Sequence, residues 1–151
     1  MRITGQKIIK IKFEVDTNPP GIFCTEDKLL IQPYSFYVKC FCLKDLFAGK
    51  IHALLFRRWN KRIKGRDWFD FEWYIRQGTS INLEHLEVRA RQSNDWTGGL
   101  LSLEAVKDIL IKRISCIDWE QAKADIRPFI TNLSVLDIWS AQYFTELVAR
   151  L

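Results

Sequence analysis

The feature that most constrains the fold is a change in the spacing of apolar residues near residue 43. Before this point apolar and polar side chains alternate, which is the period of a strand with one buried face. We predict a first strand over residues 7–16, whose apolar face consists of Ile9, Ile11, Phe13 and Val15. Two prolines follow, and neither can donate a hydrogen bond to a neighbouring strand. Further extended segments are predicted over residues 28–32 and 36–43.

After residue 43 the apolar residues recur every three or four positions, which predicts amphipathic helices. The helices also carry local boundary signals, because Asn, Ser and Asp suit the first position before a helix and Gly suits the position after its end. Asn82, Ser102 and Asp118 are such N-caps, and Gly78 is a C-cap. The predicted helices cover residues 44–58, 67–77, 82–92, 102–115, 118–128 and 135–151. The chain is therefore expected to be α+β, with a sheet first and a helical bundle after it.

The charge of the chain favours anionic partners. The formal net charge is +5, and the segment from Arg57 to Arg66 (RRWNKRIKGR) holds six cationic side chains in ten residues. A solvated helix end and a nucleic-acid contact both explain such a run. On the second interpretation the contacts come from Arg57, Arg58, Lys61 and Arg62.

The cysteine pattern predicts reduced structural thiols. Cys40 and Cys42 are too close together for the usual zinc pairing, and no second close pair accompanies them. The N-terminus has no signal-peptide pattern, and no apolar segment has membrane-spanning length. We therefore expect a cytoplasmic protein that does not bind membranes, with Cys24, Cys40, Cys42 and Cys116 all reduced.

Three places carry polar residues that simple patterning leaves unexplained, and the first is the polar face of the opening strand. Glu14 lies there between Phe13 and Val15, with Asp16 two residues further on. A solvent-facing strand of mixed charge is one explanation. The other is a carboxylate that a sheet presents to a metal ion.

The second place is Lys50, which shares a helical stripe with Leu46 and Leu54. An ammonium group on such a stripe either extends to the edge of the apolar surface or is held in a cleft for a phosphate. The small neighbours Ala48 and Gly49 allow a ligand to approach the helix.

The third place is the pair Asp67 and Asp70, three residues apart on one face of a helix. Asp67 suits the first turn of that helix. Asp70 lies among aromatic residues and needs a partner wherever it is buried. An ion pair between Asp70 and Lys50 is the hypothesis that explains both residues.

In this order the three places resemble the motifs of the AbiEii/AbiGii toxin family of nucleotidyltransferases. The family's second motif, an apolar–polar–apolar–acidic strand, is matched by Ile11-Lys12-Phe13-Glu14. The third, a helix with a lysine, is matched by residues 45–50 (DLFAGK). The fourth, Asp-x-x-Asp followed by an apolar residue, is matched by residues 67–71 (DWFDF), preceded by Lys64-Gly65-Arg66.

The resemblance implies part of a DNA polymerase β-like mixed sheet over residues 1–43, core helices with the Lys and Asp motifs over 44–78, and a helical region over 79–151. It implies Mg²⁺-dependent transfer of a nucleotide from an NTP to an acceptor such as tRNA, in toxin–antitoxin or phage-defence systems. Glu14 would ligate the metal and help to activate the acceptor. Lys50 would contact the triphosphate, and Arg66 would also bind the nucleotide. Asp67 and Asp70 would orient Lys50 or contact nucleotide or acceptor.

One family motif has no counterpart. A Gly-Ser followed by Asp-x-Asp or Asp-x-Glu should precede the Glu14 strand, and residues 1–6 do not contain it. We therefore expect this chain alone to be inactive or nearly so, with an open sheet edge that forms a homodimer or pairs with a missing N-terminal segment. The alternatives are a non-catalytic RNA-binding module and a protein-interaction remnant.

Overall fold

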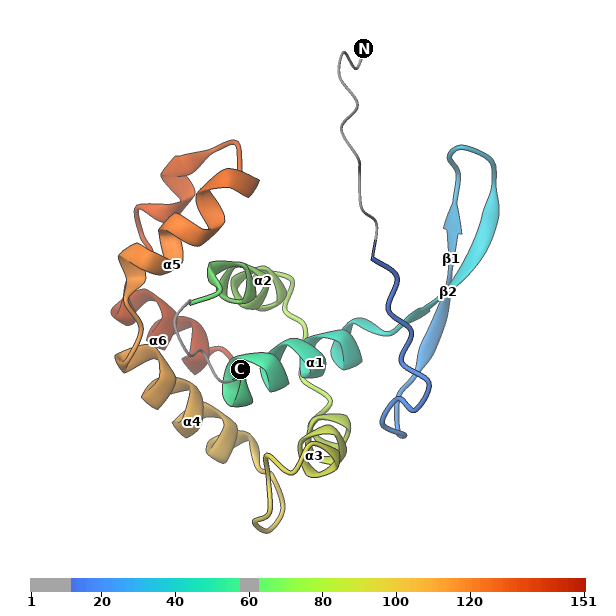
Figure 1. Ribbon diagram of the computed structural model, residues 1–151, viewed down its shortest axis with the longest axis horizontal. Helices are drawn as coiled ribbons and strands as arrows, with labels where there is room; N and C mark the ends of the chain where they lie inside the picture. The colour runs from blue at the N-terminus through green and yellow to red at the C-terminus, as the bar shows by residue number, and fades with distance from the viewer. Residues whose placement is uncertain (1–11, 58–62) are drawn as a thin grey trace.

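The computed structural model describes residues 12–57 and 63–151, and it shows a β-hairpin followed by a group of packed helices (Figure 1). The α+β prediction is confirmed. The elements are β1 (Thr25–Leu30), β2 (Phe36–Phe41), α1 (Leu43–Phe56), α2 (Gly65–Arg76), α3 (Leu83–Gln92), α4 (Leu103–Ser115), α5 (Trp119–Ile126), the 3₁₀ helices η1 (Arg127–Phe129) and η2 (Leu133–Leu136), and α6 (Ala141–Ala149).

The two strands form an antiparallel pair whose register runs from Thr25 opposite Phe41 to Leu30 opposite Phe36. The extended segments predicted near these positions are confirmed. The strand predicted over residues 7–16 is wrong for the part that the structure describes, because residues 12–16 have no strand structure. A strand is stable only when a neighbour pairs with it, and among the residues that the structure describes β1 and β2 pair with each other alone. Phe13 and Val15 are consequently exposed rather than buried.

Cys24 and Cys42 form a disulfide, which corrects the prediction that all four thiols are reduced. The hairpin explains the pairing, because Cys24 and Cys42 occupy the next position outward from the Thr25–Phe41 pair. Their Cα atoms are 5.6 Å apart, within the range that a disulfide spans. Cys42 is the N-cap of α1 rather than a strand residue, so it does not share a strand face with Cys40. Cys40 and Cys116 are free thiols.

The helix boundaries follow the local signals closely. The side chains of Asn82, Ser102 and Asp118 each accept a hydrogen bond from a backbone N–H of the helix that follows. Gly78 has φ +64°, and the turn after α2 uses this left-handed conformation to end the helix. The single helix predicted over residues 135–151 is wrong, since η2 and α6 are separate. Trp139 lies between them with its indole buried, and Ser140 caps a new helix.

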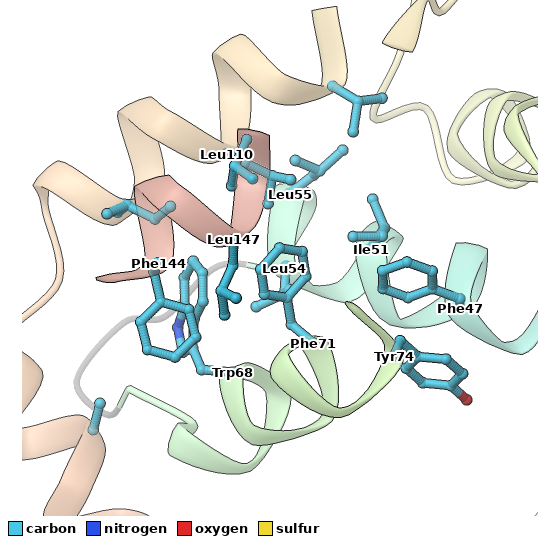
Figure 2. Packing of buried hydrophobic residues seen from close by; sticks show 14 of the residues in the cluster. Phe47, Ile51, Leu54, Leu55, Trp68, Phe71, Tyr74, Leu110, Phe144 and Leu147 are labelled. Atoms are coloured by element: carbon cyan, nitrogen blue, oxygen red, sulfur yellow. The ribbon is translucent and has the colours of Figure 1, made fainter. Parts of the chain in front are cut away.

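The buried core joins helices from all parts of the described chain. Helix α1 lies centrally and contacts α2, α3 and α4, while α2 also contacts α5 and α6 (Figure 1). Phe47, Ile51 and Leu54 of α1 lie beside Trp68 and Phe71 of α2 (Figure 2). The division into residues 1–43, 44–78 and 79–151 stays a prediction. In the described ranges no helix is both long enough and apolar enough to cross a membrane.

Helices α2 and α5 approach each other very closely at Gly65. A Cβ atom at this position would overlap the backbone oxygen of Ala122. Gly65 therefore sets the angle at which α2 leaves the loop. It thereby also sets the positions of Asp67 and Asp70, roughly half a turn and one and a half turns further along the helix.

Candidate functional site

The ion pair predicted between Lys50 and Asp70 is confirmed. Lys50 Nζ of α1 lies 2.6 Å from Asp70 Oδ2 of α2. Packing of the two helices through Phe47 and Phe71 brings these side chains together at the edge of the core. The side chains are 42% and 37% exposed, so the pair is accessible to a ligand from solvent.

Asp67 forms a second ion pair that sequence reasoning did not identify. Its carboxylate accepts a hydrogen bond from Arg57, the C-cap residue of α1, and only 10% of the Asp67 side chain is exposed. Arg113 of α4 supports this end of α1, because its Nε and Nη2 donate to the Leu55 carbonyl oxygen at 3.0 and 2.7 Å. Two cation–carboxylate pairs thus connect α1 to α2 side by side.

Four of the sequence-predicted residues border one cleft of about 580 Å³, which we name the Glu14 cleft. Glu14 enters it from the N-terminal segment, Lys50 and Arg57 from α1, and Asp67 from α2. Glu14 itself is exposed and forms an ion pair with Lys12. Gly49 also lines this cleft, and there is open space where its side chain would be, as the small residues beside Lys50 predicted. Ala48, by contrast, is buried in the core.

A second cleft of about 400 Å³ adjoins the first, and we name it the Phe129 cleft. Lys50, Arg57 and Asp67 line both clefts, so these residues form a shared wall. Asp70 and Arg66 line the Phe129 cleft only. The structure therefore places Glu14 in one cleft and Asp70 in the other, with Lys50 and Asp67 lining both.

Asp45 is a buried carboxylate that the sequence reasoning did not single out. Its Oδ2 accepts a hydrogen bond from the backbone N–H of Cys24 at 2.9 Å, and its Oδ1 accepts one from Asn82 Nδ2 at 2.6 Å. It thereby joins the hairpin to α1 and α3 at the base of the Glu14 cleft. Its place in the first turn of α1 was the available signal, since acidic residues are favoured there.

The basic run is only partly within the described residues. Arg57 is engaged by Asp67, which explains this residue without a nucleic acid. Arg58, Lys61 and Arg62 lie outside the described residues, so their predicted contacts stay a prediction. Arg66 is exposed, and its guanidinium carbon lies 4.8 Å from the centre of the Phe129 ring.

The oxygen ligands near the Glu14 cleft decide how a divalent metal would be held. In the described part of the chain, the one cluster of three potential ligand side chains is Cys24, Cys42 and Asp45, and its sulfur atoms are bonded to each other. Mg²⁺ requires oxygen ligands and is commonly bound by one or two carboxylates together with substrate phosphates. Glu14, with Asp16 at the same cleft, fits that shared mode of binding rather than a site formed by protein alone.

Comparison with known proteins agrees with these motifs. A family model described as "Nucleotidyl transferase AbiEii toxin, Type IV TA system" matches residues 1–149. No curated protein and no solved structure matches the chain. Since the family match covers nearly all of the 151 residues, the chain belongs to the AbiEii nucleotidyl transferase toxin family of type IV toxin–antitoxin systems.

Proposed function

We propose that this chain handles the nucleotide in a metal-dependent transfer from an NTP to an acceptor hydroxyl. The observation that carries the proposal is the convergence of Glu14, Lys50 and Asp67 on one cleft, although more than fifty residues separate the first from the last. Phosphoryl-group transfer depends mainly on positioning and on cations that neutralise the phosphate oxygens. A cleft lined by the Glu14 carboxylate and by the cations of Lys50 and Arg57 meets both needs.

Lys50 and Arg57 are the groups that would bind the phosphates. Asp70 holds the Lys50 ammonium in place but is itself partly exposed, so a triphosphate can take over this contact. Asp67 is nearly buried and keeps Arg57 at the wall of the cleft. This arrangement lets Lys50 move toward a substrate while Arg57 stays in position.

Glu14 is the residue that would hold Mg²⁺ jointly with the substrate phosphates. When bound, the metal would neutralise charge at the reacting phosphate. Glu14 lines the cleft and its side chain is exposed, so an acceptor hydroxyl is able to approach the carboxylate and transfer its proton to it.

We further propose that the acceptor is an RNA such as tRNA and that the reaction takes place in the cytoplasm, where NTP and tRNA are available. The toxin–antitoxin family supports an antitoxin as the partner. A role in phage defence is part of the same proposal. Among the described residues β1 and β2 form a two-stranded sheet, so each strand has an outer edge that is able to pair with another strand. This supports a homodimer or pairing with a separate N-terminal segment.

The test uses the whole 151-residue chain, labelled NTPs, Mg²⁺ and total tRNA. We expect NTP binding in equilibrium dialysis that is roughly tenfold weaker in Lys50→Ala, since one charge-assisted contact is lost. Lys112→Ala, an exposed lysine of α4, is the matched control and should bind normally. Absence of NTP binding, or equal binding by Lys50→Ala, would overturn the proposal.

Transfer is measured in the same samples as label attached to tRNA. That this chain alone transfers little or nothing stays a prediction from the sequence. Incorporation by the wild-type chain that disappears in Glu14→Gln would contradict that prediction while supporting nucleotidyl transfer.

A further inference from the structure

Phe129 is an exposed aromatic side chain in a cleft that is also lined by four cationic and two acidic side chains. The ring is 60% exposed, although its backbone is set firmly between buried Ile126 and partly buried Ile130. The short helix η1 turns the chain directly after α5, and Pro128 lies within it. An exposed aromatic ring on such a turn offers a flat apolar surface, and the side chain loses little conformational entropy when a ligand stacks on it.

Arg66 lies against the Phe129 ring and ties it to α2. The guanidinium carbon is 4.8 Å from the ring centre, which is the distance of a cation–π contact. Phe69, one turn further along α2, and Ile126 complete the apolar side of the Phe129 cleft. The ring thus has a fixed neighbour while much of its surface remains in solvent.

The same cleft has more positive than negative side chains. Lys50 and Arg57 are each matched by an aspartate, whereas Lys64 and Arg66 form no ion pair with a carboxylate of the described ranges. Two cations are therefore available for an anionic ligand. The cavity volume of about 400 Å³ suits a mononucleotide and excludes a folded polymer.

We propose that the Phe129 cleft is the subsite for the base and sugar of a nucleotide, with the base stacked on Phe129 and the phosphates directed toward Lys50 and Arg57. This inference rests on the proposed nucleotidyl transfer and specifies how its substrate is held. Base–aromatic contacts of this kind tolerate any base, because every base has a π-face. Arg66 acts as a positioning residue that orients the ring.

The experiment compares ATP with inorganic tripolyphosphate, which has the phosphates but no base, in calorimetric titrations of the whole chain. We expect the wild type to bind ATP roughly tenfold more tightly than tripolyphosphate, the effect of one stacked base. Phe129→Ala should weaken ATP to the level of tripolyphosphate and leave tripolyphosphate unchanged. Phe129→Trp should restore the preference for ATP.

Two further variants separate stacking from charge and from loss of folding. Arg66→Lys keeps the charge but loses the planar contact, so it should weaken ATP more than tripolyphosphate. Tyr34→Ala removes another exposed aromatic ring, at the turn of the hairpin, and should change neither affinity. Because Phe129 is mostly exposed, its variants should keep the wild-type circular dichroism spectrum.

A short single-stranded RNA tests whether the base that stacks on Phe129 belongs to the free NTP or to the acceptor RNA. Loss of RNA binding in Phe129→Ala, with ATP binding unchanged, would assign the stacked base to the end of the acceptor and still support the subsite. Equal wild-type affinities for ATP and tripolyphosphate, together with RNA binding that is insensitive to Phe129, would overturn it. If ATP binding is weakened by Lys50→Ala but not by Phe129→Ala, and RNA binding does not depend on Phe129, the subsite is wrong and the proposed function stands. If the wild type binds no NTP, both the subsite and the proposed function are wrong.

Discussion

At the scale of residues, Asp67 and Asp70 show how burial changes the role of the same side chain. The two lie about one turn apart on α2, and each is paired with a cation of α1. Asp67 is nearly buried beside Arg57, the C-cap residue of α1, whereas the Asp70 side chain is more than one-third exposed. We infer that Asp67 serves mainly to hold the two helices together and Asp70 to hold Lys50 ready for a substrate.

This difference predicts unequal effects of the same substitution on stability. Asp67→Asn leaves Arg57 without its carboxylate in a partly buried place and should lower the free energy of unfolding by about 2 kcal/mol. Asp70→Asn breaks an exposed pair and should lower it by less than about 1 kcal/mol. Urea denaturation of both variants measures the difference, and equal effects would contradict this assignment of roles.

Glu72 and Tyr143 form a partly buried polar contact that makes the protein sensitive to alkaline pH. Tyr143 donates to Glu72 Oε1 at 2.8 Å, and Trp139 Nε1 donates to Glu72 Oε2 at 2.9 Å. Burial, followed by the hydrogen bond to Glu72, raises the pKa of Tyr143 to about 12. The folded protein therefore keeps the phenol proton at pH values where the unfolded chain, with an ordinary pKa near 10, loses it.

The sign of the pH dependence follows from this raised pKa. The stabilisation is fully present below pH 10 and is lost as the pH rises through about 12. Tyr143→Phe should lower the free energy of unfolding at pH 8 by about 1.5 kcal/mol and should flatten its decline between pH 10 and 12. Urea denaturation across this pH range tests the prediction. A wild type and a variant with parallel pH profiles would exclude Tyr143 as the titrating group.

At the scale of elements, Gly49 of α1 and Gly65 of α2 differ in the space available for a side chain. Gly65 permits the contact between α2 and α5, whereas Gly49 faces open space on α1 at the Glu14 cleft. The helical conformation alone would favour Ala at both positions. Only the neighbouring backbone of Ala122 makes Gly65 irreplaceable.

Alanine substitution at the two glycines should therefore have opposite signs. Gly65→Ala forces α2 away from α5 and should lower the free energy of unfolding by about 2–3 kcal/mol. Gly49→Ala meets no atom and should raise it by about 0.5–1 kcal/mol through helix propensity. Thermal and urea unfolding of the two variants provide the measurement. A stabilising Gly65→Ala would show that the α2–α5 contact is looser than the geometry indicates.

At the scale of the whole molecule, the hairpin is connected to the helical core by few links. Among the described residues, none of β1 or β2 belongs to the buried hydrophobic cluster. The Cys24–Cys42 disulfide, the Cys42–Cys24 backbone hydrogen bond and the contact of Cys24 with Asp45 hold its base. The two parts are therefore expected to lose their structure separately.

Reduction of the disulfide should free the hairpin while the helices stay folded. The bridge spans 18 residues, and a loop of this length corresponds to about 3 kcal/mol of stabilisation. We expect tryptic cleavage at Lys28 and Lys39 to become much faster in Cys24→Ser, while the helical circular dichroism signal and its thermal midpoint change little. Cys116→Ser, a free and exposed thiol, is the control. Unchanged cleavage, or a joint loss of helical signal, would contradict this separation.

Much of the helical part was determined by sequence alone, because the signals are local. Caps at Asn82, Ser102 and Asp118 and the C-cap at Gly78 depend on residues within one turn of each boundary. The Lys50–Asp70 pair was also predictable, since an acid among aromatic residues and a lysine on an apolar stripe each require a partner. The motif order was enough to indicate the family that the comparison confirms.

Tertiary structure alone decided the contacts between segments that have no common local pattern. The register of the hairpin places Cys24 opposite Cys42, and the packing of α1 on α2 gives Asp67 its cation. The strand expected at residues 12–16 failed because a strand depends on a neighbour, which an alternating pattern does not supply. Phe129 lies beside α2 in the Phe129 cleft because Gly65 lets α5 approach α2 closely. A periodic pattern specifies which face of an element is apolar, but the element that packs on that face is selected by the shapes of the assembled helices.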